Sequence, residues 1–357
     1  MESKKNVLGK NYLVCIILIS VFLLFTITSS VAAETEYKWK LAHPNVREIQ
    51  NDTMELFSEL AGVYSNGKME IEFYPNGILG EHDEIFHAVQ EGSIEMAALY
   101  PYTNLVPNGT IDGMCWATQT FDQGAVLYNP SHGMLFKVMS AAYKEAGMHL
   151  LFTIVDGIYG IGNNVRPIKT PDDFKNLKWR VSGTLGYVKT FENMGKETGM
   201  TLATIPWSEL YNSLDRGVVD GCWSTWGSMV EERHMEVLKY YTALDLQFSV
   251  NYIVVNEEMW DNLPLELQEA LNKAGEIAGI YNYETYRRAV ANFKSEITES
   301  GCEIYYPTPG ELELFREKSN IPAVWKELFA PSIEKLFPNQ NMPQKVLDEI
   351  NRVYKTY

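Results

Sequence analysis

The sequence predicts an α/β protein built from two lobes. Strand and helix patterns alternate along the chain, and two β–helix–β units within about 60 residues favour a parallel sheet. The chain has 357 residues, which is too long for one ordinary hydrophobic core and suits two domains. A long helical pattern begins near Leu263-Pro264. Its length of about 35 residues far exceeds the usual roughly 11–12, so we expect it to run along both lobes.

The first half of the chain predicts three strands and two helices in alternation. Met69, Ile71 and Phe73 alternate with charged residues, which indicates a half-buried strand. Gly67 and Gly92 stop the two helices, as glycine commonly does at a helix end. The expected segments are strands at 39–42, 69–73 and 94–98 and helices at 49–64 and 85–89.

The middle of the chain continues the alternation. Residues 149–155 are almost all apolar, as in a strand buried on both faces. Thr170 is a suitable N-cap for a short helix with Pro171 in its first position. Further segments are expected as helices at 135–146 and 208–214 and strands at 179–181, 201–205 and 217–221. The apolar stripe of the long helix comprises Leu267, Leu271, Ala274, Ala278, Tyr281, Ala289, Phe293 and Ile297, and Gly301 ends the helix.

The N-terminal residues have the features of a secretory signal peptide. Lys4, Lys5 and Lys10 precede an apolar run at 12–25, and Val31-Ala32-Ala33 provides a small-x-small end. The run is shorter than the roughly 20 residues of a membrane span. We expect cleavage after residue 33, and therefore a periplasmic protein that is not embedded in the membrane.

The absence of a low-complexity linker and of repeats in the sequence predicts that chain crossovers join the lobes. The apolar residues of the tail could pack on their own chain or across a dimer. The expected organisation is a signal peptide at 1–33, a first lobe at 34–157 plus about 246–285, a second lobe at 158–245 plus about 286–330, and a C-terminal helical tail at 331–357.

The net charge of −16 argues against nucleic acid and anionic lipid as partners. Such a protein can bind an anion only through a local cationic pocket. Cys115, Cys222 and Cys302 remain after signal cleavage, an odd number without CxxC spacing. The sequence therefore predicts neither a disulfide scaffold nor a zinc knuckle, and leaves one possible bridge open.

The sequence does not complete the motifs that would indicate catalysis or cofactor binding. Gly157, Gly160 and Gly162 follow an apolar strand, as in a dinucleotide-binding loop. The last glycine of the G-x-G-x-x-G fingerprint is missing, however, and Arg166-Pro167 prevents the helix that should follow. His82 and His87 are five residues apart, whereas a helical metal site needs four. We expect no cofactor, no metal and no catalytic residues, and thus a protein that is not an enzyme.

Arg180 is the strongest candidate for a binding residue. It lies in a short apolar strand that follows a helix, so it could face a cleft at the end of a strand. Its planar guanidinium could hold a carboxylate by two parallel hydrogen bonds. The pattern alone equally allows an exposed arginine in a surface ion pair.

Six short sequence elements, each present once, follow one another in a characteristic order across nearly the whole chain after residue 33. They are PNGILG at 75–80, GSIEM at 92–96, RPIKTPDD at 166–173, LKWRV at 177–181, PWSELY with GVVDG between 206 and 221, and an Asn-Trp-Leu-Pro-Gln series at 256–268. In this order they resemble the DctP-type substrate-binding subunits of TRAP (tripartite ATP-independent periplasmic) transporters.

The resemblance implies a periplasmic-binding-protein-like fold, with two α/β lobes around a central ligand cleft. It implies a solute-binding protein that captures a small organic acid between closing lobes and delivers it to a TRAP-type membrane permease. Arg180 matches the arginine that forms a salt bridge with the substrate carboxylate in this family.

The sequence departs from the family pattern at three positions. Tyr159 stands where many members have a second arginine, and Ser224 where many have asparagine. Trp223 replaces the glutamate of metal-using members, so the resemblance implies no metal. Further candidates for ligand contact are Trp226, and on the opposing wall Tyr100, Tyr102 and Trp116. One arginine among several aromatic residues favours a monocarboxylate with an apolar or aromatic body over a sialic acid or a C4-dicarboxylate.

Three other functions compete with this interpretation. A binding protein of an ATP-driven importer shares the architecture but lacks the ordered motif series, and a neighbouring permease gene would decide. A ligand-reporting module for a sensor needs a partner acting in trans. An enzyme needs a perturbed acid or base near Arg180, and the sequence suggests none.

Overall fold

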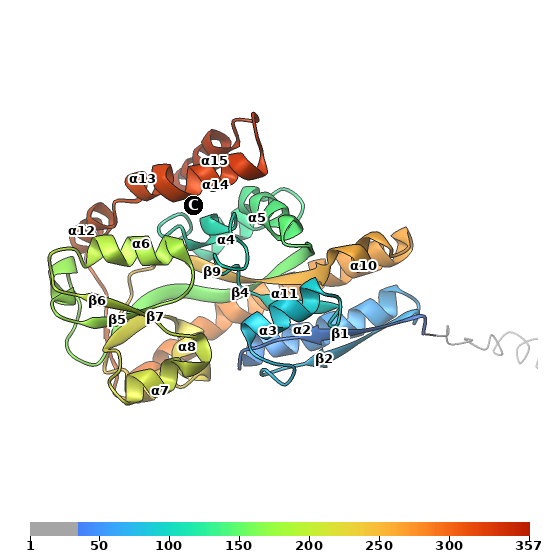
Figure 1. Cartoon of the computed structure of the whole chain (residues 1–357). Coiled ribbons are helices and arrows are strands. Elements are labelled where there is room, and N and C mark those ends of the chain that lie inside the picture. The colour runs from blue at the N-terminus through green and yellow to red at the C-terminus, as the bar shows by residue number, and fades with distance from the viewer. Residues whose placement is uncertain (1–34) are drawn as a thin grey trace, which may run out of the picture.

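The strands follow the order β2-β1-β3-β9-β4-β7-β5-β6 in the computed structural model, which describes residues 35–357 (Figure 1). The predicted signal peptide at 1–33 lies outside the described residues. The first four strands and the start of β4 form one sheet, here the first sheet. The end of β4 and the remaining strands form the second sheet, which β8 and β10 extend.

The first sheet contains the two predicted β–helix–β units. β1 pairs in parallel with both β2 and β3, which confirms the parallel arrangement. β9 pairs antiparallel with β3, so the complete sheet is mixed. Its elements are β1 (Tyr37–Ala42), α2 (Glu48–Tyr64), β2 (Met69–Tyr74), α3 (His82–Gln90), β3 (Met96–Leu99), η1 (Thr110–Gly113), α4 (Phe121–Leu127), α5 (Met134–Glu145), β9 (Phe248–Asn256) and α10 (Glu257–Asp261).

The second sheet has a parallel pair of strands at its edge. β5 pairs in parallel with β6, and the capping box between Thr170 and Asp173 begins the short helix before β5. The elements are η2 (Pro171–Phe174), β5 (Lys178–Val181), α6 (Leu185–Met194), β6 (Thr201–Thr204), η3 (Trp207–Glu209), α7 (Leu210–Asp215), β7 (Gly221–Thr225), α8 (Trp226–Glu231), α9 (His234–Val237), β8 (Tyr240–Thr242), β10 (Glu303–Tyr305) and α12 (Pro309–Ser319).

Two long elements connect the sheets. β4 (Met148–Asn163) pairs with β9 up to Ile158 and with β7 from Tyr159 onward. The predicted strand at 149–155 is therefore the first half of a longer one. α11 (Leu265–Glu299) has the predicted 35 residues. Its Asn282 binds Thr53 of α2, and its Tyr286 hydroxyl accepts the Gly227 N–H of α8. The expectation that this helix runs along both halves is confirmed.

The C-terminal tail packs on its own chain. It contains α13 (Ile321–Val324), a π-helical turn (Trp325–Phe329), α14 (Ala330–Leu336) and α15 (Met342–Thr356). Ile333, Val346 and Ile350 are buried in the same core as residues of α4 and α5. Figure 1 shows α14 and α15 beside α5.

Two details of the sequence prediction are wrong. The strand expected at 217–221 begins only at Gly221, because Gly217 adopts a positive φ of 65° and Val218 is exposed in the turn. Tyr281 is not part of the buried stripe of α11; its side chain is 39% exposed. Val218 and Tyr281 each fit an apolar pattern in the sequence. The turn at Gly217 places Val218 toward solvent, and the rotation of α11 does the same for Tyr281.

Three further expectations for the described part of the chain concern disulfide bonds, metal-binding groups and membrane-spanning helices. Cys115, Cys222 and Cys302 are free and buried. Across residues 35–357, no group of three or more His, Cys, Asp or Glu side chains could hold a metal ion. None of the helices described there is both long and apolar enough to cross a membrane.

Candidate ligand-binding site

Arg180 lies on β5, and its side chain is 1% exposed. Its Nε and Nη2 donate hydrogen bonds to the carbonyl oxygen of Ile205, at 2.9 and 2.7 Å. These bonds fix the guanidinium near the carboxyl ends of the parallel strands β5 and β6, where open α/β sheets bind ligands. The alternative of an exposed ion-pair arginine is wrong.

Arg180 has no ion-pair partner among the residues that the structure describes. None of the acidic side chains in residues 35–357 lies within ion-pair distance of its guanidinium, which packs between Trp207 and Trp223 at 5.2 Å from each ring centre. Burial lowers the pKa of Arg180. A buried cation without a partner is unfavourable, so this position favours an anionic group.

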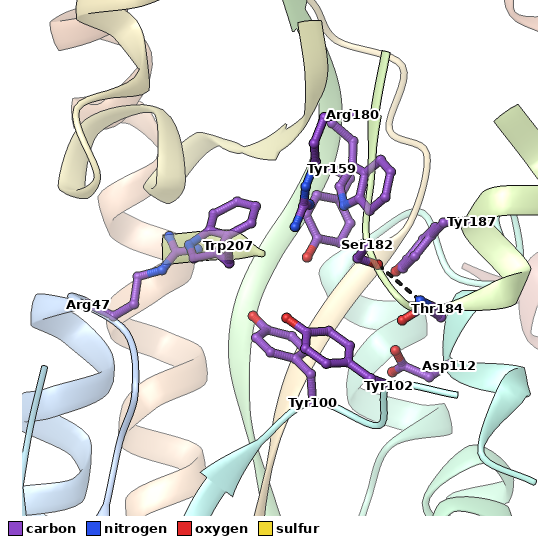
Figure 2. A pocket seen from close by; sticks show the side chains of 11 residues that line it. Arg47, Tyr100, Tyr102, Asp112, Tyr159, Arg180, Ser182, Thr184, Tyr187 and Trp207 are labelled. Atoms are coloured by element: carbon purple, nitrogen blue, oxygen red, sulfur yellow. Dashed lines mark hydrogen bonds between the residues drawn. The ribbon is translucent and has the colours of Figure 1, made fainter. Parts of the chain in front are cut away.

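A cavity surrounds the exposed part of this guanidinium (Figure 2). The cavity has an empty volume of about 400 Å³, part of which is open to the surface. Loops after β3 and β5 contribute much of the wall. The lining residues are Arg47, Tyr100, Tyr102, Asp112, Tyr159, Arg180, Ser182, Thr184, Tyr187, Trp207 and Trp223.

Four of the seven site residues predicted from sequence come together here. Arg180, Tyr159, Trp223 and Tyr100 line the cavity, and so does Tyr102, named with them as a weaker candidate. The Tyr159 hydroxyl donates a hydrogen bond to Asp156 at 2.9 Å. It therefore holds a buried acid at this site.

Ser224, Trp226 and Trp116 lie outside the cavity lining. Successive residues of β7 point to opposite faces, so Ser224 turns away from Trp223 and contacts His234 Nδ1 at 3.1 Å. Trp226 packs on Tyr241 and beneath Lys294. The Trp116 indole donates to Ser319 at 3.1 Å. Strand alternation places Ser224, the start of α8 places Trp226, and packing on α12 places Trp116.

Six lining residues were missed from sequence. Ser182 and Thr184 follow β5 directly, so the rule for strand ends could have identified them. Trp207 lies within the PWSELY element. No local signal distinguishes the others, which are Arg47, Asp112 and Tyr187.

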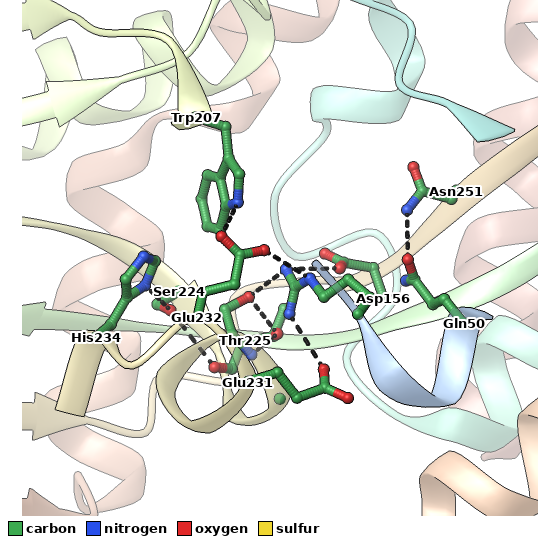
Figure 3. Close-up of polar contacts among 12 residues, drawn as sticks. Gln50, Asp156, Trp207, Ser224, Thr225, Glu231, Glu232, His234 and Asn251 are labelled. Atoms are coloured by element: carbon green, nitrogen blue, oxygen red, sulfur yellow. Dashed lines mark hydrogen bonds and ion pairs between the residues drawn. The ribbon is translucent and has the colours of Figure 1, made fainter. Parts of the chain in front are cut away.

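Arg47 joins the two sheets through a cluster of acids (Figure 3). It precedes α2, and its guanidinium is 3.1 Å from Asp156, 2.9 Å from Glu232 and 3.6 Å from Glu231. Figure 3 shows the three acids converging from β4 and the end of α8. Trp207 Nε1 donates to Glu232. The charge of Arg47 is thus already neutralised, unlike that of Arg180.

Asp112 is a buried acid on the cavity wall. Its side chain accepts a hydrogen bond from the Tyr252 hydroxyl at 2.7 Å, and the residue is 4% exposed. Burial raises the pKa of Asp112 to about 7, although the Tyr252 bond acts to lower it. Within residues 35–357, the Asp112 carboxylate has no ion-pair partner.

Replacing Asp112 by asparagine is expected to stabilise the ligand-free protein increasingly as pH rises. The folded protein keeps the Asp112 proton up to a pKa of about 7, whereas the unfolded chain releases it near 3.8. Ionisation therefore lowers stability between about pH 4 and 7, by a few kcal/mol at most. Urea unfolding at pH 5 and pH 8 should show a growing difference between Asp112→Asn and the parent; a constant difference contradicts it.

A family model matches residues 42–332 of the chain. Its description is bacterial extracellular solute-binding protein, family 7, or DctP. The C4-dicarboxylate-binding periplasmic protein DctP of Rhodobacter capsulatus is 26% identical over 276 residues, 77% of this chain and 78% of that protein. The ectoine-binding periplasmic protein TeaA of Halomonas elongata is 24% identical over 331 residues, 90% of each protein.

Solved structures have the same fold. DctP7 of Bordetella pertussis, which binds pyroglutamic acid, matches with a TM-score of 0.74 at 17% identity over 88% of this chain and 99% of that one. A TRAP periplasmic solute binding protein of Sulfurospirillum deleyianum with bound succinate matches with a TM-score of 0.74 at 22% identity, over 85% and 99%. At these identities the likeness concerns the fold.

Proposed function

The chain belongs to the DctP family of bacterial extracellular solute-binding proteins, and on this premise we propose that its cavity captures a small organic acid for a TRAP-type permease. The family consists of solute-binding proteins of transporters and not of enzymes. Arg180 is the observation that carries the proposal. A buried guanidinium without an acidic partner needs an anion, and a ligand carboxylate can supply it.

The lobes close around this anchor. Arg180, Trp207 and Trp223 come from the second lobe, at 158–245 plus about 286–330. Tyr100 and Asp112 come from the first, at 34–157 plus about 246–285. The boundary near 157 is supported by β4, which leaves β9 and joins β7 at this point. Hinge closure is favoured by a ligand that contacts both lobes at once.

Export to the periplasm precedes binding. The proposal places cleavage of the signal peptide after Ala33, in line with the extracellular nature of the family. The released protein then carries its ligand to the membrane subunits of the transporter.

A thermal-shift screen of organic acids on the purified protein tests the function. A ligand present at 100 times its Kd stabilises the folded protein by about 2.7 kcal/mol. We expect at least one small carboxylate to raise the melting temperature with increasing concentration. A complete screen in which only uncharged solutes do so contradicts a carboxylate site.

Aromatic and short aliphatic monocarboxylates are expected to bind at least about tenfold more tightly than succinate or fumarate. The reason is that Arg47 is occupied by Asp156 and Glu232, so a second ligand carboxylate meets no free cation and loses its hydration uncompensated. Calorimetric titration of matched acids measures the ratio. Tighter binding of the dicarboxylates contradicts the expected selectivity.

A further inference from the structure

Asp112 is a buried acid on the cavity wall. A ligand whose only charged group is a carboxylate could not form an ion pair with it. The hydrogen bond from Tyr252 is the one contact that its carboxylate accepts among the described residues. The Tyr252 bond occupies Oδ1, and the side chain lines the same cavity as Arg180. A carboxylate that loses its hydration inside a protein requires a cation or further donors.

The other acids near the cavity already have partners. Asp156 accepts from the Tyr159 hydroxyl and pairs with Arg47. Glu232 pairs with Arg47 and accepts from the Trp207 indole. Among the described lining residues, Arg180 and Asp112 are thus the basic and the acidic side chain that lack an ion-pair partner.

These two residues lie apart along the cavity wall. In Figure 2, the guanidinium of Arg180 lies above the Tyr102 ring, and the carboxylate of Asp112 lies beside that ring at the lower right, below Ser182. The charges of the site thus run from positive at β5 to negative at η1.

Aromatic rings line the same cavity as Arg180 and Asp112. Tyr187 packs against Trp223 with 4.9 Å between ring centres, and Tyr100 stacks on Tyr102 at 6.4 Å. The faces of such rings attract cations and also cover apolar methylene groups. Rings beside an unpaired carboxylate form a suitable environment for a positively charged nitrogen.

We propose that the ligand is a compact zwitterion, whose carboxylate binds Arg180 and whose cationic nitrogen binds Asp112. This inference rests on the proposed function, because it uses the same carboxylate anchor and adds a second contact. It narrows the class of small organic acids to amino acids, cyclic imino acids and betaines.

Matched ligand pairs test the inference by calorimetry. Each pair shares a carbon skeleton and a carboxylate, and only one member carries a cationic nitrogen. Suitable pairs are proline with cyclopentanecarboxylate, pipecolate with cyclohexanecarboxylate, and glycine betaine with 3,3-dimethylbutyrate. The zwitterion of at least one pair should bind tenfold or more tightly than its partner, since a charged hydrogen bond or ion pair accounts for at least about that factor.

The outcomes separate this inference from the proposed function. If the plain acids bind as tightly as the matched zwitterions or more tightly, or if no zwitterion binds, the zwitterion proposal is wrong but the carboxylate anchor at Arg180 stands. If no carboxylate of either kind binds, the carboxylate anchor at Arg180 fails as well.

The variant Asp112→Asn provides the second test. Its amide oxygen can still accept from Tyr252 but carries no charge, so the affinity for the zwitterion should fall and its preference over the plain acid should fall at least tenfold. Asp172→Asn, an exposed acid on η2, is the matched control and should change neither. An unchanged preference in Asp112→Asn refutes the contact.

Proton release distinguishes a cation from a neutral oxygen at Asp112. Because burial raises the pKa of Asp112 to about 7, part of the protein carries this proton near neutral pH, and a ligand cation would displace it. Titrations in two buffers of different ionisation enthalpy should show proton release that Asp112→Asn lacks. Proton uptake at this residue indicates that a protonated Asp112 donates to a ligand oxygen, which contradicts the proposal.

Discussion

Replacing Arg180 by alanine is expected to weaken binding of the carboxylate ligand by about 2–5 kcal/mol, or roughly 30-fold to several thousand-fold. The side chain is 1% exposed, and no other lining cation is free to take its place, because Arg47 is paired with acids. The ligand carboxylate would then lose water without gaining a partner. Calorimetry with the best acid from the thermal-shift screen measures the loss.

Two further variants make this result specific. Arg180→Lys retains the charge but not the planar fork that binds a carboxylate through two hydrogen bonds, so an intermediate affinity is expected. Arg216→Ala removes an exposed arginine from the same lobe and should bind like the parent. If Arg180→Ala folds, as judged from its ligand-free melting curve, and still binds with parental affinity, the anchor is elsewhere.

Replacing Arg47 by alanine is expected to open the lobes and weaken ligand binding by about 3–5 kcal/mol. Arg47 compensates Asp156 and Glu232, whose side chains are 0% and 14% exposed. Without it, like charges from β4 and the end of α8 face each other in a dry interface. Separation of the lobes restores their hydration, so small-angle scattering of the ligand-free variant should give a larger radius of gyration.

The double variant Arg47→Ala with Glu232→Gln separates this mechanism from a general loss of packing. The amide removes one of the repelling charges, and part of the lost affinity should return. Arg288→Ala, with a side chain 81% exposed on α11, is the control and should leave both scattering and affinity unchanged. A single variant Arg47→Ala with a parental radius and affinity contradicts a role in closure.

The fold could be predicted largely from local patterns. Met69, Ile71 and Phe73 alternate because one face of β2 is buried, and the long stripe of α11 follows from the period of a helix. These signals depend only on near neighbours in sequence. The strand placed at 217–221 failed because Val218 and Val219 look apolar, whereas the turn at Gly217 leaves Val218 exposed.

The site could be predicted only in part. Arg180 was identifiable because it lies near a strand end and matches a family motif. Ser224 and Trp226 were chosen from the same stretch as Trp223, but strand alternation and the start of α8 turn them away from the cavity. Arg47 and Asp112 carry no motif, and their importance arises from neighbours more than 40 residues away in sequence.

Local sequence patterns were sufficient to predict the α/β class, the long connecting helix, the family and the arginine on β5. These properties are encoded in periodicity and in short motifs, which need no knowledge of distant contacts. Three features required the three-dimensional contacts: the acids that Arg47 neutralises, the face of β7 that meets the cavity, and the packing of the tail on α4 and α5 of its own chain. The physical reason is that pairing and burial depend on which side chains meet in space. A charge is free or compensated only once the chain has brought its neighbours together.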